Sequence, residues 1–214
     1  MDFNHFREEL EKAFTRPLPG QDAQYQMTPA GRERVDLKRI DQEKVKQAAT
    51  AALFFPMQNR PHLILTRRVE YPGVHSGQIS FPGGRREPED ESFMDTALRE
   101  THEEIGVKAG DITLLGSLTA LYIPPSNFFV YPFVGILDQK PEFFPQESEV
   151  AEILSLDFNL FLPGESLKQT IVDARGFKLK VPAFNINGHI IWGATAMMIS
   201  ELRAMFTQRA PNLN

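Results

Sequence analysis

The stretch "FPGGRREPEDESFMDTALRETHEEIGV", Phe81 to Val107, places six glutamates, two aspartates and three arginines behind a double glycine. Ser92, followed three residues later by Asp95, has the pattern of a capping box, which satisfies free N–H groups at the start of a helix. Gly106 is of the residue type that most often ends helices. The stretch therefore predicts a helix that begins near Ser92 and ends near Gly106.

The second half of this helix gathers three carboxylates on one side. At about 100° per residue, Glu100, Glu103 and Glu104 fall within an arc of roughly 100°. Arg99 precedes Glu103 by four residues and can pair with it. A charged helix face is usually just solvated, but carboxylates this close repel one another unless a cation neutralises them. Mg²⁺ and Mn²⁺ prefer such oxygen ligands, so this face is a candidate metal site.

The apolar residues of the same helix predict how it packs. Met94, Leu98 and Ile105 fall together on an adjoining face, which we expect to lie against a sheet. Gly83 and Gly84, ahead of the helix, are expected to serve backbone geometry, because a residue without Cβ allows a close approach.

Outside this segment the pattern predicts an α/β protein with a mixed sheet. Residues 1–45 are interpreted as an amphipathic helix over 2–15 followed by a connecting arm, and residues 46–214 as the main domain. A helix is also expected at the C-terminal end, over 195–206. Strands are expected at 48–56, 62–68, 112–123, 128–137 and 150–158, with a hairpin turning at "NG" within 184–192.

Composition narrows the class of protein. The chain has 214 residues, a net charge of -5 and no cysteine, which argues against a protein that coats nucleic acid and excludes disulfides and thiolate chemistry. The N-terminus carries several acidic residues and no apolar core of a signal peptide, and the longest apolar runs reach about ten residues, well short of a membrane span. We therefore expect a cytoplasmic protein with no membrane or nucleic-acid partner.

The charged segment resembles the Nudix box, in which a glycine, five residues, a glutamate, seven residues and Arg-Glu precede a Glu-Glu pair and Gly-aliphatic. Two positions depart from that pattern: Thr101 replaces an aliphatic residue, and either Asp90 or Glu91 fills the upstream acidic position. The positions that match are Gly84, Arg99, Glu100, Glu103, Glu104, Gly106 and Val107.

This resemblance implies a fold and a chemistry. Nudix proteins have an α/β/α sandwich with a mixed sheet, the box forming a loop-helix-loop; here an N-terminal helical extension precedes it. Most of them hydrolyse a nucleoside diphosphate linked to another group, using Mg²⁺ or Mn²⁺. Carried over to this chain, Glu100 and Glu104 are metal ligands and Glu103 is a ligand or water-orienting base. Arg99 orients a glutamate, and Glu149 is a further catalytic candidate.

The flanks resemble the coenzyme A pyrophosphatase branch of this family. In "LILTRRVEYPGVHSGQISFPGG" (63–84), most positions follow that branch's upstream signature, although Gly73 stands where an arginine is expected. "IIWGATAMMISEL" (190–202) resembles its C-terminal segment, so the resemblance covers about residues 46–206. It implies cleavage of coenzyme A to 3′,5′-ADP and 4′-phosphopantetheine. The candidate substrate-binding residues are Arg67, Arg68, His75, Arg85 and Arg86.

Other interpretations stay open at this point. Another nucleoside diphosphate derivative, such as ADP-ribose or a dinucleoside polyphosphate, would suit the same box, as would a ligand-binding module without catalysis. The retained glutamates argue against the binding module. Many members of the family are dimers, so a homodimer is compatible with the sequence. Trp192 is expected to pack in a strand, and Glu149 is preferred to Glu152 as the additional carboxylate.

Overall fold

The computed structural model describes residues 1–70, 77–174 and 176–207. Within these residues the strands form one eight-stranded and one three-stranded sheet. The large sheet contains β1 (Lys46–Met57), β2 (Arg60–Arg68), β3 (Ile79–Ser80), β4 (Gly83–Arg85), β5 (Thr113–Ser117), β6 (Leu121–Ile123), β7 (Phe128–Ile136) and β8 (Val150–Asp157). Strands β1 and β7 run parallel while the other pairs are antiparallel, so the sheet is mixed.

Strands β1 and β2 diverge beyond their shared turn, and this divergence determines where the charged segment enters the sheet. They pair only near their shared turn, where Gln58 and Asn59 both have positive φ. Farther along, β3 pairs with β2 while β4 pairs with β1. Residues 79–85 therefore lie between the two long strands and carry the double glycine into the sheet.

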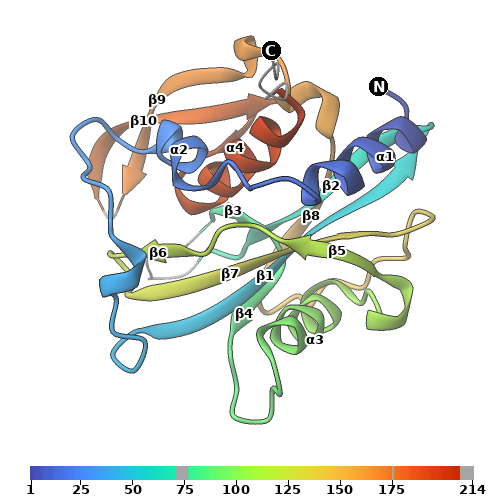
Figure 1. Cartoon of the computed structure of the whole chain (residues 1–214), viewed down its shortest axis with the longest axis horizontal. Helices are drawn as coiled ribbons and strands as arrows, with labels where there is room; N and C mark the ends of the chain where they lie inside the picture. The colour runs from blue at the N-terminus through green and yellow to red at the C-terminus, as the bar shows by residue number, and fades with distance from the viewer. Residues whose placement is uncertain (71–76, 175, 208–214) are drawn as a thin grey trace.

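Helices cover both faces of the large sheet, as an α/β/α arrangement requires (Figure 1). Helix α3 (Phe93–Ile105) packs on one face, and α1 (Phe3–Phe14) and α4 (Gly193–Thr207) lie on the other, with the short α2 (Gly20–Gln24) against α4. This confirms the predicted fold class and the N-terminal helix. Five 3₁₀ turns complete the described elements: η1 (Tyr25–Met27), η2 (Leu37–Arg39), η3 (Ala109–Asp111), η4 (Phe158–Phe161) and η5 (Gly164–Ser166).

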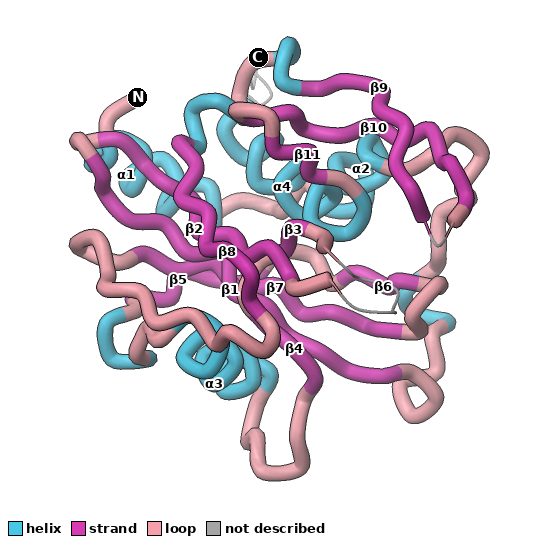
Figure 2. Tube along the Cα trace, turned by 180° about the vertical axis from the view of Figure 1, so that it is seen from behind, coloured by secondary structure: helices cyan, strands magenta, loops and turns pink. Residues whose placement is uncertain are grey.

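The small sheet contains β9 (Leu167–Ala174), β10 (Phe177–Ile186) and β11 (His189–Ile191), in the order β11-β10-β9. Its β10–β11 turn confirms the predicted hairpin, since Asn187 and Gly188 both have positive φ, as a type I′ turn requires. Strand β9 was not anticipated from sequence. Figure 2 shows β11 beside β3, where the two sheets meet.

The single strand expected over 112–123 is wrong, because the chain forms β5 and β6 with a break between them. The break holds Thr119, whose backbone N and Oγ1 donate to Oε1 of Glu201 at 3.2 and 2.7 Å. Glu201 lies on α4 and is fully buried. A buried carboxylate needs hydrogen-bond donors, and the bend supplies two of them.

Glu201 and a group of aromatic rings also attach the N-terminal segment to the rest of the fold. Gly20 N and Gln24 Nε2 donate to this carboxylate at 3.2 and 2.8 Å. Phe6 of α1 is fully buried and stacks on Phe206 of α4, with ring centroids 5.1 Å apart. Among the described residues, none of the helices has the length and apolar character needed to cross a bilayer.

Candidate functional site

Helix α3 begins and ends where the sequence predicts. The Ser92 side chain accepts from the N–H of Asp95 at 3.2 Å, and the Asp95 carboxylate accepts from the N–H of Ser92 at 2.8 Å, which completes the capping box. Gly106 ends the helix at φ 77°, in the left-handed conformation that glycine adopts without strain. These local bonds set the position of each glutamate along the helix.

The predicted sheet-packing face of α3 is partly wrong. Ile105 is fully buried as expected, but Met94 is 41% exposed and Leu98 is only half-buried. Ala97 and Thr101 face the sheet instead. Small side chains there allow the helix to approach β1 closely, and this close approach also brings Glu104 against the sheet.

The double glycine holds two of the three glutamates against the backbone. Gly83 N donates to Oε2 of Glu104 at 3.1 Å. Gly83 has φ 148°, and a Cβ there would lie 2.3 Å from the carbonyl oxygen of Ala49. At Gly84, a Cβ would lie 2.4 Å from Oε2 of Glu100. The sequence expectation that both glycines serve backbone geometry therefore agrees with the structure.

Alanine at the two glycines is expected to give opposite results. Gly83→Ala should lower the melting temperature strongly, because its Cβ meets backbone that cannot move aside and its φ is strained. Gly84→Ala should keep a near-normal melting temperature but lose the hydrolytic activity that the sequence resemblance implies, because only the flexible Glu100 carboxylate has to move. Thermal unfolding and metal-dependent hydrolysis measured on both variants check this. An active Gly84→Ala enzyme would contradict it.

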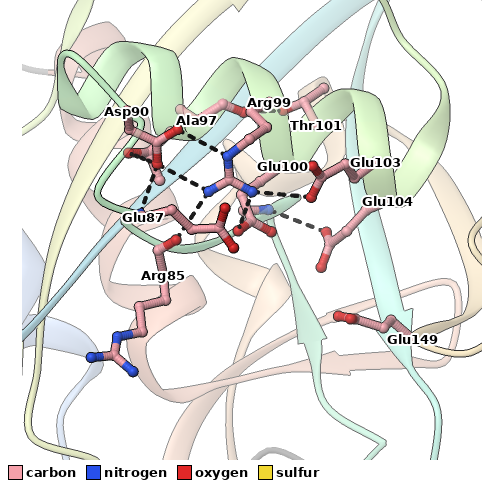
Figure 3. Close-up of polar contacts among 12 residues, drawn as sticks. Arg85, Glu87, Asp90, Ala97, Arg99, Glu100, Thr101, Glu103, Glu104 and Glu149 are labelled. Carbon is pink, nitrogen blue, oxygen red and sulfur yellow. Dashed lines mark hydrogen bonds and ion pairs between the residues drawn. The ribbon is translucent and has the colours of Figure 1, made fainter.

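Arg99 organises the carboxylates at the start of the site (Figure 3). Its guanidinium binds Asp90 through two parallel hydrogen bonds, Nε to Oδ1 at 2.9 Å and Nη2 to Oδ2 at 3.0 Å. Nη1 donates to Glu100 and to Glu103, each at 3.0 Å. Glu91 is exposed, and its backbone carbonyl accepts from Arg86. Asp90 is therefore the upstream acidic residue that pairs with Arg99.

The bidentate contact explains the charge state of this pair. The hydrogen bonds from Arg99 hold the pKa of Asp90 far below its usual range, against the opposing effect of burial. The N–H of Glu87 and the hydroxyl of Thr96 add donors to the same carboxylate, each at 2.9 Å. Asp90 is thus a fixed anion that holds Arg99 in place.

Arg68 connects the buried end of the glutamate face to Glu149. Its Nη1 lies 3.3 Å from Oε1 of Glu104, and its Nη2 lies 3.2 Å from Oε2 of Glu149. Glu149 comes from the segment before β8, far from the box in sequence, and Figure 3 shows it approaching Glu104 from outside the helix. The structure therefore places Glu149 beside Glu104, at the buried end of this face.

Burial and like charge raise the pKa values of two glutamates. Burial raises the pKa of Glu104 to about 7, against the stabilising effects of Gly83 N–H and Arg68, and the charges of Glu100 and Glu149 raise it further. Burial likewise raises the pKa of Glu100, with additional repulsion from Glu103 and Glu149. The carboxylates at this face therefore resist ionising together, and a bound cation would relieve that repulsion.

These side chains fit a hard divalent cation by chemistry, because they offer only oxygen ligands at a crowded anionic face. Among the described residues, no three acidic or histidine side chains converge on one point at ligand distance. Arg99 holds Glu100 and Glu103 while Arg68 spans Glu104 and Glu149. Binding an ion here therefore requires glutamates to rotate away from the two guanidinium groups.

The predicted substrate-binding cations occupy different surroundings. Arg86 stacks over the Phe93 ring at 4.8 Å and donates to two backbone carbonyls, which supports the loop. Arg85 is exposed, and its side chain points away from the glutamates in Figure 3. Arg67 lines a cavity near the small sheet. His75 lies outside the described residues.

Comparison with known proteins agrees with this geometry. Residues 45–173 match the model of the NUDIX domain. The chain is 33% identical over 154 residues to the "Uncharacterized Nudix hydrolase NudL" of Yersinia pestis (strain Pestoides F) and to that of Yersinia pseudotuberculosis serotype O:1b, covering 71% of this chain and 77% of each relative.

Solved structures support the same fold. A Nudix hydrolase from M. smegmatis, RenU, superposes with a TM-score of 0.54 at 17% identity, covering 79% of this chain and 89% of that one. A MutT/nudix family protein from Enterococcus faecalis gives a TM-score of 0.50 at 15% identity, covering 81% and 66%. The family match, the identity to NudL and the arrangement of Arg99 with its glutamates together show that the chain belongs to the Nudix hydrolase family.

Proposed function

We propose that this Nudix hydrolase cleaves the pyrophosphate of coenzyme A or its derivatives, releasing 3′,5′-ADP and 4′-phosphopantetheine or its acylated form. The observation that supports hydrolysis is the carboxylate face, in which Arg99 binds Glu100 and Glu103 while Arg68 bridges Glu104 and Glu149. A module that only binds ligand has no need of this face.

Mg²⁺ or Mn²⁺ held by Glu100 and Glu104, with Glu103 as a third ligand, would neutralise pyrophosphate oxygens and make a bound water more acidic. Glu103 and Glu149 have the more exposed side chains, at 51% and 46%. Either carboxylate therefore has room to accept the proton of the attacking water. Arg99 holds carboxylates of the helix in place and is a positioning residue in this scheme.

The choice of coenzyme A rests on the sequence flanking the box. The segment over 63–84 and the "IIWGATA" segment resemble the coenzyme A branch in sequence. Arg67 is the cation that we assign to substrate among the four described candidates, because Arg68 is engaged by Glu104 and Glu149 while Arg86 supports its loop. Arg85 serves as the control position in the test of this assignment.

Specificity constants for coenzyme A, 3′-dephospho-coenzyme A and ADP-ribose test the proposal. Coenzyme A should have the highest specificity constant of the three substrates. Arg67→Ala should weaken its turnover about tenfold or more relative to the dephospho form, since a hydrogen bond to a charged group is worth about 1.5–3 kcal/mol. Arg85→Ala should change the ratio far less. Faster cleavage of ADP-ribose than of coenzyme A by the unmodified protein would refute the assignment.

A further inference from the structure

A cavity of about 390 Å³ lies where the end of β2 meets the small sheet. Its volume is within the range of small-molecule sites, roughly 300–1,000 Å³. The wall combines a cation and an imidazole with flat and aliphatic apolar groups, and it also includes Asp173, whose carboxylate accepts from the N–H of Gly176 at 2.7 Å. The lining residues that matter here are Arg67, Ile79, Val172, His189, Ile190 and Trp192.

The polar side of this cavity is built from Arg67 and His189. Nη2 of Arg67 lies 3.0 Å from Nδ1 of His189. A guanidinium only donates, so Nδ1 accepts and the ring proton of this neutral histidine sits on Nε2. Nε of Arg67 lies 3.0 Å from Oε2 of Glu152, at an angle that makes this an ion pair rather than a hydrogen bond. Among the residues that the structure describes, Nε2 of His189 and Nη1 of Arg67 therefore remain able to donate to an anion.

Glu152 fixes Arg67 without closing the site. The Arg67 side chain is 39% exposed and that of Glu152 is 48% exposed. An exposed ion pair of this kind is weak, because solvent screens both charges. A phosphate can therefore bind the arginine in addition to Glu152 or displace it.

The apolar side of the cavity presents an aromatic ring. Trp192 follows β11 and is half-buried, and Ile190 beside it is also half-buried. The sequence predicted simple packing for Trp192, but a partly exposed indole on a cavity wall also offers a surface on which a flat base can stack. Ile79 and Val172 are buried and extend the apolar wall.

Consecutive residues of β2 contact this cavity and the carboxylate face, but the two sites lie on opposite sides of the sheet. Arg67 and Arg68 are consecutive, so their Cα atoms are about 3.8 Å apart, and they are the last two residues of β2. Arg68 contacts Glu104 of α3, whereas Arg67 contacts His189 of β11. The two sites therefore lie at the same end of β2, on opposite faces of the sheet.

We propose that this cavity binds the phosphorylated nucleoside half of the substrate, with the base against Trp192 and the 3′-phosphate at Arg67 and His189. The proposal rests on the proposed function, since it assigns one half of coenzyme A to a defined subsite. The pantetheine arm has neither a ring to stack nor an anion distant from the pyrophosphate. It would leave the cation and the indole unused.

Trp192 is the single tryptophan of the chain, so its fluorescence reports occupancy of this cavity directly. The protein is titrated in EDTA, without divalent metal, with 3′,5′-ADP, 5′-AMP and 4′-phosphopantetheine. We expect saturable quenching by 3′,5′-ADP, with 5′-AMP binding about tenfold more weakly because it lacks the 3′-phosphate. A response to 4′-phosphopantetheine alone would overturn the assignment.

Variants separate binding in the cavity from general effects. Arg67→Gln and His189→Gln should each abolish most of the preference for 3′,5′-ADP, with melting temperatures measured to exclude unfolding. Lys168→Ala is the control, because it removes an exposed cation of β9 that does not line the cavity. A preference unchanged by both cavity variants would refute the subsite.

The subsite and the proposed function can fail separately. Hydrolysis of coenzyme A with no response of Trp192 to 3′,5′-ADP would overturn the subsite and leave the proposed function standing. Selective binding of 3′,5′-ADP without hydrolysis of coenzyme A would overturn the proposed function and support the subsite.

Discussion

Glu104→Gln is expected to reduce metal-dependent hydrolysis by at least about 100-fold. In the proposed scheme Glu104 is a metal ligand, and its loss removes a charge interaction worth several kcal/mol in the transition state; each 1.4 kcal/mol is about a factor of ten in rate. The fold should persist, because glutamine keeps the carbonyl oxygen that accepts from Gly83 N–H. Steady-state kinetics across a range of Mg²⁺ and Mn²⁺ concentrations measure the effect.

The same variant should change how stability depends on pH in metal-free protein. Burial raises the folded-state pKa of Glu104 to about 7, so the folded state favours the protonated acid. The contribution of this bound proton to the free energy of unfolding is fully present below the ordinary pKa of about 4.3. It is lost as pH rises through 7. The melting temperature of the unmodified protein should therefore fall more steeply from pH 5 to 8 than that of Glu104→Gln.

Glu91→Gln is the matched control for both measurements. It removes an acidic side chain from the same segment, but Glu91 is exposed and outside the Arg99 network. Its activity and pH profile should follow those of the unmodified protein. Near-normal turnover of Glu104→Gln at saturating Mg²⁺ would contradict the assignment of this glutamate to the metal face.

Arg99→Met is expected to destabilise the protein by about 3 kcal/mol, because it leaves the Asp90 carboxylate buried without its partner. The Asp90 side chain is only 4% exposed. For a chain of this length the loss corresponds to a fall of about 6–12 °C in melting temperature. Activity should fall as well, since Glu100 and Glu103 lose the group that orients them.

The effect of Arg99→Met should depend on pH in a defined direction. Arg99 lowers the folded-state pKa of Asp90, so the pair contributes stability above the ordinary pKa of about 3.9 and loses it as pH falls toward the folded value. The difference in melting temperature should be full at pH 6–7 and shrink below about pH 4. Arg7→Met is the control, because Arg7 pairs with two exposed carboxylates. A smaller loss for Arg99→Met than for this control would contradict the role of the pair.

The sequence by itself determined those features that depend on residues close together in the chain. The capping box of α3 involves residues three apart, and the Asn187–Gly188 turn involves neighbours, so local bonding rules identify both. The spacing of Glu100, Glu103 and Glu104 follows from helix geometry alone. The Nudix resemblance added the fold, because its pattern also rests on fixed spacing within one segment.

Only the tertiary structure decided which of several similar side chains makes a given contact. Asp90 and Glu91 are equivalent by spacing, yet the loop turns only Asp90 toward Arg99. Ala97 rather than Leu98 faces the sheet, because the helix approaches closely only through small side chains.

The same limit applies to residues far apart in sequence. Thr119 interrupts a strand because the buried Glu201, 82 positions later, needs donors. Arg67 and Arg68 look alike in sequence, but alternation along β2 directs one toward His189 and the other toward Glu104 and Glu149. Burial and pairing of this kind depend on which surfaces pack together, and no local pattern in the sequence contains that information.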